Sequence, residues 1–198
     1  ITAATTDGIA IASGDFDATG ILGVSSNKIT VGPNDGDVRG QVLAGGNVLA
    51  SSTGNGTTGV DDATATISQS DLFGIRNIDI VGGQVGTNSV IGTSLGDFDA
   101  TATSVKGDST ASSDVNAFGI LGDGSDTINL SGGISAIAQL SNTVTATSVA
   151  GNAIASATSD AVGLSGYNVS IIGSGTLNAS AISNSQSLAS SVGGRAGA

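Results

Sequence analysis

The side chains with potential for chemistry are almost all aspartates. All sixteen acidic residues are Asp, and the chain contains no His and no Cys. Close pairs of carboxylates that could serve in catalysis occur at Asp15/Asp17, Asp61/Asp62 and Asp97/Asp99. Paired carboxylates can act as acid, base or nucleophile in the cleavage of glycosidic bonds. Because Glu and His are absent and only three Arg are present, groups to bind and protonate a substrate are scarce. We therefore expect no enzyme.

A second candidate is a loop with the spacing of a calcium site. Gly122-Asp-Gly-Ser-Asp126-Thr-Ile128 has the Gly-x-Gly-x-Asp-x-apolar outline of the calcium-binding nonapeptide of β-rolls. In such loops carboxylate and carbonyl oxygens surround the ion, and Asp123 and Asp126 would be the ligands here. These sites need tandem copies, and Asn34-Asp-Gly-Asp37 is only a loose second one. An ordinary Asp/Gly turn is the alternative, and no other cofactor is expected.

Threonines form the third pattern. Thr64-Ala-Thr66, Thr101-Ala-Thr103 and Thr145-Ala-Thr147 each place two hydroxyls on one face of a strand, because alternate side chains of a strand point to opposite sides. Solenoid proteins that bind ice use flat Thr arrays of this kind. Cross-strand Thr ladders that stabilise a sheet are the alternative explanation.

The composition restricts both fold and partners. With a net charge of −11 and only five Lys and Arg, the chain lacks the clustered cations that nucleic acid or an anionic membrane surface requires. No apolar run is long enough to span a bilayer. Aromatic residues make up 3% and Gly supplies 32 residues, so the core must consist of small side chains. The absence of Glu and the abundance of Asp, Gly and Thr indicate strands and turns rather than helices.

A degenerate repeat organises the whole chain. A Gly-Ile/Leu pair recurs four times, at Gly20-Ile21, Gly74-Ile75, Gly119-Ile120 and Gly163-Leu164. Each pair follows an aspartate (Asp17, Asp71, Asp114, Asp160) and precedes a short alternating strand (29–31, 78–80, 128–130, 169–171). We predict a single domain over 1–198, with a partial repeat at 1–16 and repeats at 17–70, 71–113, 114–159 and 160–198. Residues 33–61 are the most divergent part, and the about ten extra residues of that copy are interpreted as a surface insertion. The chain is interpreted as a possible segment of a longer array.

The second half of each repeat is a run of Ala, Thr and Ser with a period of two. Ala102-Thr-Ser-Val105 returns as Ala146-Thr-Ser-Val149, and a helix cannot gather a period of two on one face. These runs predict strands with Ala or Val turned inward. An all-β parallel β-solenoid of four repeats of 43–54 residues is the preferred fold class, and a propeller or a sandwich is the alternative.

The motifs also resemble a known class of sequence. Gly-Asp-Gly-x-Asp-x-Ile-Asn-x-x-Gly at 122–132, then Ile134-Ser-Ala-Ile-Ala138 and Asp160-Ala-Val-Gly-Leu164, are similar to the long degenerate repeats of giant bacterial surface proteins, the haemagglutinin-like and haemolysin-like adhesins. The resemblance implies an extracellular β-solenoid that serves as stalk, fibre or adhesive surface. We therefore predict a structural filament protein whose partner is itself, by head-to-tail contact or further repeats. An adhesin or binding module for calcium, ice or surface glycans is the alternative.

Overall fold

A computed structural model describes residues 1–23, 28–30, 37–54, 61–76, 79–81, 89–122, 127–130, 132–166, 170–173 and 175–198. Every regular element in these ranges is a β-strand, and every strand pairing is parallel. The strands form three sheets, which we call sheets A, B and C. The prediction of an all-β chain with parallel sheets is confirmed.

Sheets A and B are long and sheet C is short. Sheet A has the order β1-β5-β8-β11-β14, and its strands are Thr2–Thr5, Val38–Ser52, Ser89–Ser104, Gly133–Ser148 and Thr176–Ser191. Sheet B has the order β15-β12-β9-β6-β2, with β3 also paired to β6. Its strands, from β2 to β15, are Ala10–Gly14, Ala18–Leu22, Ala63–Arg76, Ser109–Leu121, Ala153–Ser165 and Ala196–Gly197. Sheet C has the order β13-β10-β7-β4, with strands Ser170–Gly173, Thr127–Leu130, Asp79–Val81 and Lys28–Thr30.

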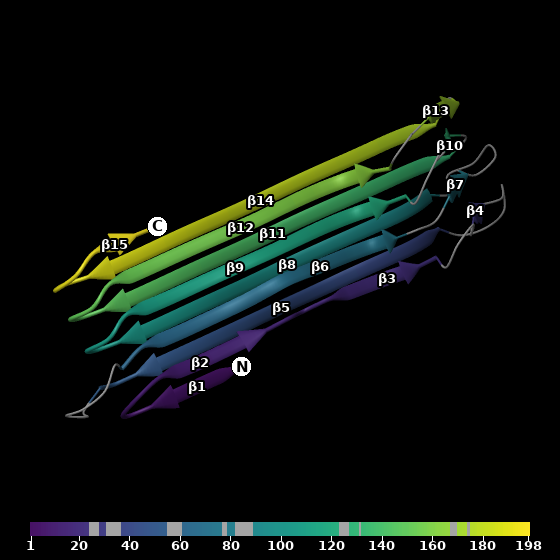
Figure 1. Ribbon diagram of the computed structural model, residues 1–198. Coiled ribbons are helices and arrows are strands. Elements are labelled where there is room, and N and C mark those ends of the chain that lie inside the picture. The colour runs from purple at the N-terminus through teal and green to yellow at the C-terminus, as the bar shows by residue number, and fades with distance from the viewer. Residues whose placement is uncertain are drawn as a thin grey trace.

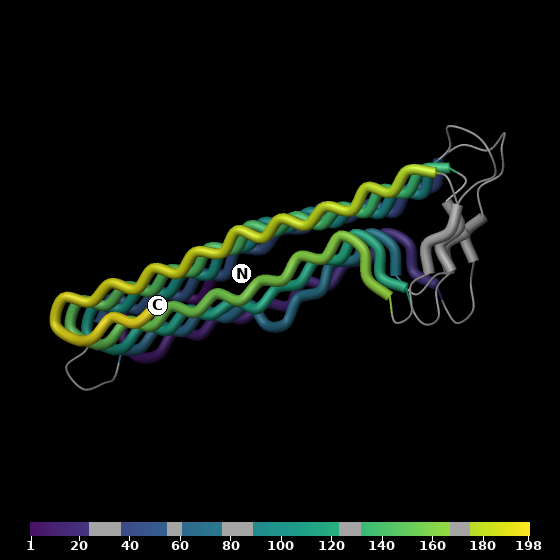
Figure 2. The backbone as a smooth tube through the Cα atoms, turned by 90° about the horizontal axis from the view of Figure 1, so that it is seen from above, coloured from purple at the N-terminus to yellow at the C-terminus, as the bar shows by residue number. Residues whose placement is uncertain are grey.

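The chain visits the three sheets in a fixed rotation. A strand of sheet A is followed by one of sheet B and one of sheet C, and the next strand of sheet A then lies beside the first (Figure 1). Sheets A and B form two layers, joined at one end by tight turns (Figure 2). Parallel neighbours require such a return path because a hairpin can join only antiparallel strands. One repeat of the sequence thus corresponds to one circuit.

The register of sheet A matches the repeat over the full strand length. β8 and β11 pair without a shift from Ser89 beside Gly133 to Ser104 beside Ser148, and β11 and β14 pair likewise through Ser191. In sheet B, Ile75 lies beside Ile21 and Ile120, and Leu164 beside Ile120. The Gly-Ile/Leu pairs chosen from the sequence are therefore true equivalents.

Small residues build the core between the two long sheets. Ala100, Ala102 and Ala146 are fully buried, and their neighbours along each strand alternate between the interior and the surface. Among the described residues Phe98 is the largest fully buried side chain, and its ring centroid lies 5.8 Å from that of Phe16. The prediction that the Ala/Thr runs are strands with Ala inward is confirmed.

At the recurrent glycines, the backbone of sheet B lies very close to the backbone of sheet A. A Cβ at Gly119 would lie 2.5 Å from the backbone nitrogen of Ile137, and one at Gly74 would lie 2.4 Å from that of Thr93. Any side chain would collide with backbone there, so Gly is required by space and not by its torsion angles. The Ile or Leu after each glycine then packs in a second, smaller core cluster with Val90 and Ile134.

The ten residues 53–62 between β5 and β6 correspond to only four residues, 105–108, between β8 and β9, so extra length of this copy falls within the divergent stretch 33–61. Most of 53–62 lies outside the described residues, and the surface insertion stays a prediction. Two other details of the predicted repeat are wrong. In sheet C, Ile80 and not Ile78 lies beside Ile29, and Ile171 and not Val169 lies beside Ile128. In sheet B, Asn116 and not Asp114 pairs with Asp71 and Asp160. Each error preserved the local alternation, which is why the sequence did not reveal it.

Candidate functional site

The predicted calcium ligands Asp123 and Asp126 lie outside the described residues, as do Asn34, Asp35 and Gly36 of the looser copy. In the part of the chain that the structure describes, no group of three or more His, Cys, Asp or Glu is placed to hold a metal ion. Asp37, which is described, pairs with Arg39 at 2.9 Å and accepts a hydrogen bond from the backbone N–H of Ser89. These contacts lower the pKa of the Asp37 carboxyl, with the Arg39 hydrogen bond as the main cause. The calcium site stays a prediction.

The three aspartate pairs lie in different surroundings. Asp61 is fully buried in a turn, where one carboxylate oxygen accepts a hydrogen bond from the N–H of Gly8. Asp62 accepts one from the N–H of Asp108 in the next turn. Asp15 and Asp17 lie between β2 and β3, and Asp97 and Asp99 lie on β8. Asp17 accepts a hydrogen bond from the backbone N–H of Asp71. Asp17 and Asp62 therefore each bond to the backbone of the next circuit, which is a structural role.

The tight turns between sheets A and B form a ladder of hydrogen bonds. The hydroxyl of Ser148 donates to the carbonyl of Gly107 at 2.7 Å and accepts from the N–H of Gly151 at 2.9 Å. Ser104 and Ser191 make the equivalent bonds in the turns before and after. Each turn is thus attached to the one before it, which extends the sheets around the corner.

The predicted threonine rows divide between two faces. Thr101 lies beside Thr145, and Thr103 beside Thr147, all on the outer face of sheet A. Thr143 on β11 extends this group, which we call the threonine face. Thr64 and Thr66 lie on the outer face of sheet B instead. The three rows therefore do not form one array, because the same local pattern occurs on strands of both sheets.

The strand β14 lies at the edge of sheet A. It pairs with β11 on one side, and no described strand pairs with its other side. Its sixteen residues include no charged residue and no Pro. By contrast, the free edge of β12 is partly satisfied by side chains of β14, since Ser183 donates to the carbonyl of Ser159 and Ser187 accepts from the N–H of Ala157.

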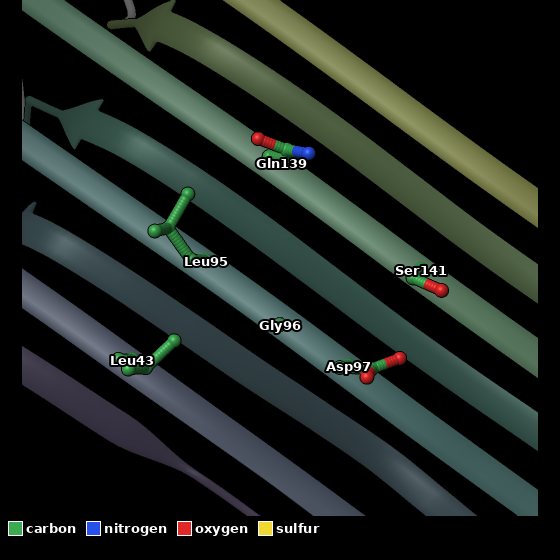
Figure 3. A pocket seen from close by; sticks show the side chains of 6 residues that line it. All are labelled: Leu43, Leu95, Gly96, Asp97, Gln139 and Ser141. Atoms are coloured by element: carbon green, nitrogen blue, oxygen red, sulfur yellow. The ribbon is translucent and has the colours of Figure 1, made fainter.

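A groove crosses the outer face of sheet A, and the sequence reasoning missed it. Its volume is about 270 Å³, and six residues from β5, β8 and β11 line it: Leu43, Leu95, Gly96, Asp97, Gln139 and Ser141. Figure 3 shows Leu43, Leu95 and Gln139 in one row across the strands, with Asp97 and Ser141 in the next. The register explains both rows, since Leu95 pairs with Leu43 and Gln139.

Two features of the chain could have suggested this groove. Gly45 pairs with Asp97, and its missing side chain leaves space beside Leu43. Leu43 itself is 81% exposed, which is uncommon for a leucine in the middle of a strand. The sequence shows both residues, but only the register brings them next to Asp97.

No family model, curated protein or solved structure matches the chain. Among the described residues, no helix is long and apolar enough to cross a membrane.

Proposed function

We propose that the chain is a structural segment of an extracellular or cell-surface fibre. In this proposal residues 1–198 are one parallel β-solenoid domain in which each repeat of about 44 residues makes a single turn. The fibre grows by stacking further strands of the same kind, supplied by more repeats or by a second copy. The fixed rotation through sheets A, B and C and the unshifted register of β8, β11 and β14 support this reading.

The free edge of β14 is the observation that carries the proposal. Soluble proteins protect a sheet edge with charges, Pro, bulges or short strands, because an open edge accepts strands from other molecules. β14 has sixteen residues paired without a shift, and it carries none of these protections in a chain of net charge −11. Its edge suits strand addition.

A proline on the free edge tests this role. The N–H groups of Thr176 and Val192 donate to the carbonyls of Gly132 and Ser148, at the two ends of β11, so the N–H groups of odd-numbered residues of β14 face the free edge. Ser185→Pro therefore removes one edge donor without removing a bond to β11. We expect the unaltered chain to sediment as assemblies that are elongated in electron micrographs, and Ser185→Pro to shift the population toward monomers.

Ser135→Ala, on the outer face of β11, serves as the surface control because it changes a side chain and leaves every backbone N–H in place. It should assemble like the unaltered chain. Purified chain that stays monomeric at high concentration, with no elongated particles, would contradict the proposal.

Ice binding is a second candidate, favoured by the threonine face. Its hydroxyls lie on adjacent strands in exact ladder register, and fully buried Ala100, Ala102 and Ala146 hold the backbone beneath them. We expect Thr145→Lys to abolish any inhibition of ice recrystallisation and Thr110→Lys, on the outer face of sheet B, to leave it intact. Lack of inhibition by the unaltered chain would exclude this function.

A further inference from the structure

The groove on sheet A combines an apolar wall with polar side chains that are accessible to solvent. Leu43 and Leu95 form the wall, and Asp97, Gln139 and Ser141 provide a carboxylate, an amide and a hydroxyl. These groups come from three adjacent strands whose register is fixed by ladder hydrogen bonds. The groove is therefore a preformed feature, which is what small-ligand sites require.

The charge of the groove defines one property of its ligand. Asp97 is exposed and forms no ion pair with another described residue. Asp99 follows two residues later on the same face of β8, and the whole chain has a net charge of −11. A cationic group would find favourable potential here, whereas an anion would be repelled.

The remaining groups define the rest of the ligand. A simple cation would use Asp97 but would leave the Gln139 amide, the Ser141 hydroxyl and the leucine wall without partners. A sugar ring presents hydroxyls that can both donate and accept, and a C–H face that can lie on Leu43 and Leu95. A ring that also carries a protonated amine would satisfy every part of the groove.

We propose that this groove binds an amino sugar with a free amine, as a unit of a glycan. The ammonium lies against the Asp97 carboxylate, which forms a charge-assisted hydrogen bond with it. Gln139 and Ser141 bond the neighbouring hydroxyls, and the C–H face of the ring packs on Leu43 and Leu95. This binding role is separate from the proposed fibre role and does not depend on self-assembly.

A titration of the ¹⁵N-labelled chain of residues 1–198 with a glucosamine tetramer tests the site. At slightly acidic pH the amines of the tetramer are protonated. We expect shift changes centred on Leu95–Asp97 and Gln139–Ser141. Asp97→Asn should weaken binding by about tenfold, as expected for loss of a charged hydrogen-bond partner. Leu43→Ala, at a side chain that is 81% exposed, should weaken binding while leaving the fold intact.

Matched controls separate the site from general attraction to an acidic protein. Asp114→Asn removes an exposed carboxylate from sheet B and should bind like the unaltered chain. Equal weakening by Asp114→Asn and Asp97→Asn would overturn the proposal, as would absence of shift changes. Equal binding of the N-acetylglucosamine tetramer would remove the role of the amine, and equally tight binding of spermidine would reduce the site to a cation site. Each of these two results overturns the amino-sugar proposal. No outcome of this titration bears on fibre formation.

Discussion

A single methyl group at Gly119 tests the closest approach of the two long sheets. Gly119→Ala would place a Cβ 2.5 Å from the nitrogen of Ile137 and 2.6 Å from the carbonyl oxygen of Gly163. Both are backbone atoms within paired strands and cannot move aside cheaply. We expect a loss of about 3 kcal/mol in the free energy of unfolding, as for an overpacked core. Urea denaturation of the two proteins measures it.

Gly197 provides the control for this substitution. A Cβ there would meet no heavy atom within 4 Å. Gly197→Ala should therefore leave the urea midpoint unchanged. If Gly119→Ala is equally harmless, the sheets are not in the close contact described.

Asp37 predicts a dependence of stability on pH. Its contacts with Arg39 and the N–H of Ser89 hold its pKa below the ordinary value of 3.8. A carboxyl whose pKa is lowered by folding stabilises the fold at higher pH, and this contribution disappears as pH falls below 3.8 through the folded pKa. Asp37→Asn should lower the melting temperature slightly at pH 7. A difference from the unaltered chain that persists unchanged at pH 2 would contradict this explanation.

At the scale of elements, the tight turns depend on one serine per circuit. Ser148 is fully buried, and Ser148→Ala would leave the carbonyl of Gly107 and the N–H of Gly151 without their partner. Unpaired buried groups of this kind cost about 1–3 kcal/mol. We expect that loss in the free energy of unfolding, measured by urea denaturation, whereas Ser135→Ala on the outer face should have little effect.

The strands themselves were predictable, and their partners only partly so. The alternation in Thr143-Val-Thr-Ala-Thr147 predicts a strand with Val144 and Ala146 inward, and the structure confirms it. The Gly-Ile/Leu pairs predicted the register of sheet B because close contact with the backbone of sheet A requires glycine at these positions. Sheet C was misaligned by two residues, since such a slip returns every side chain to its original face.

The groove illustrates what the sequence could not supply. Leu43, Asp97 and Ser141 are far apart in the chain and belong to no common motif. They meet because strands from three circuits pair, and that pairing depends on the lengths of the connections between them. The division of the threonine rows has the same origin, because Thr64 and Thr101 have similar local sequences on strands of different sheets.

At the scale of the whole molecule, the strands lie across the direction in which circuits accumulate. A strand of sixteen residues, such as β11, is roughly 53 Å long at about 3.3 Å per residue. Each additional circuit adds only about 4.8 Å, the spacing of neighbouring strands. Fibres of stacked chains should therefore give an axial reflection near 4.8 Å in diffraction, with the strands perpendicular to the fibre axis. A strand direction parallel to the axis would contradict stacking along β14.

The tight turns also determine how the molecule would respond to mechanical load. A force on the chain ends draws each strand away from its neighbour at one corner, so ladder bonds open a few at a time. The serine hydrogen bond at each turn, such as that from Ser148 to the carbonyl of Gly107, must then break before the next circuit unfolds. One circuit of about 44 residues releases roughly 150 Å of chain at about 3.4 Å per residue. Pulled from its ends, the molecule would lengthen in steps of that size and behave as an extensible tether.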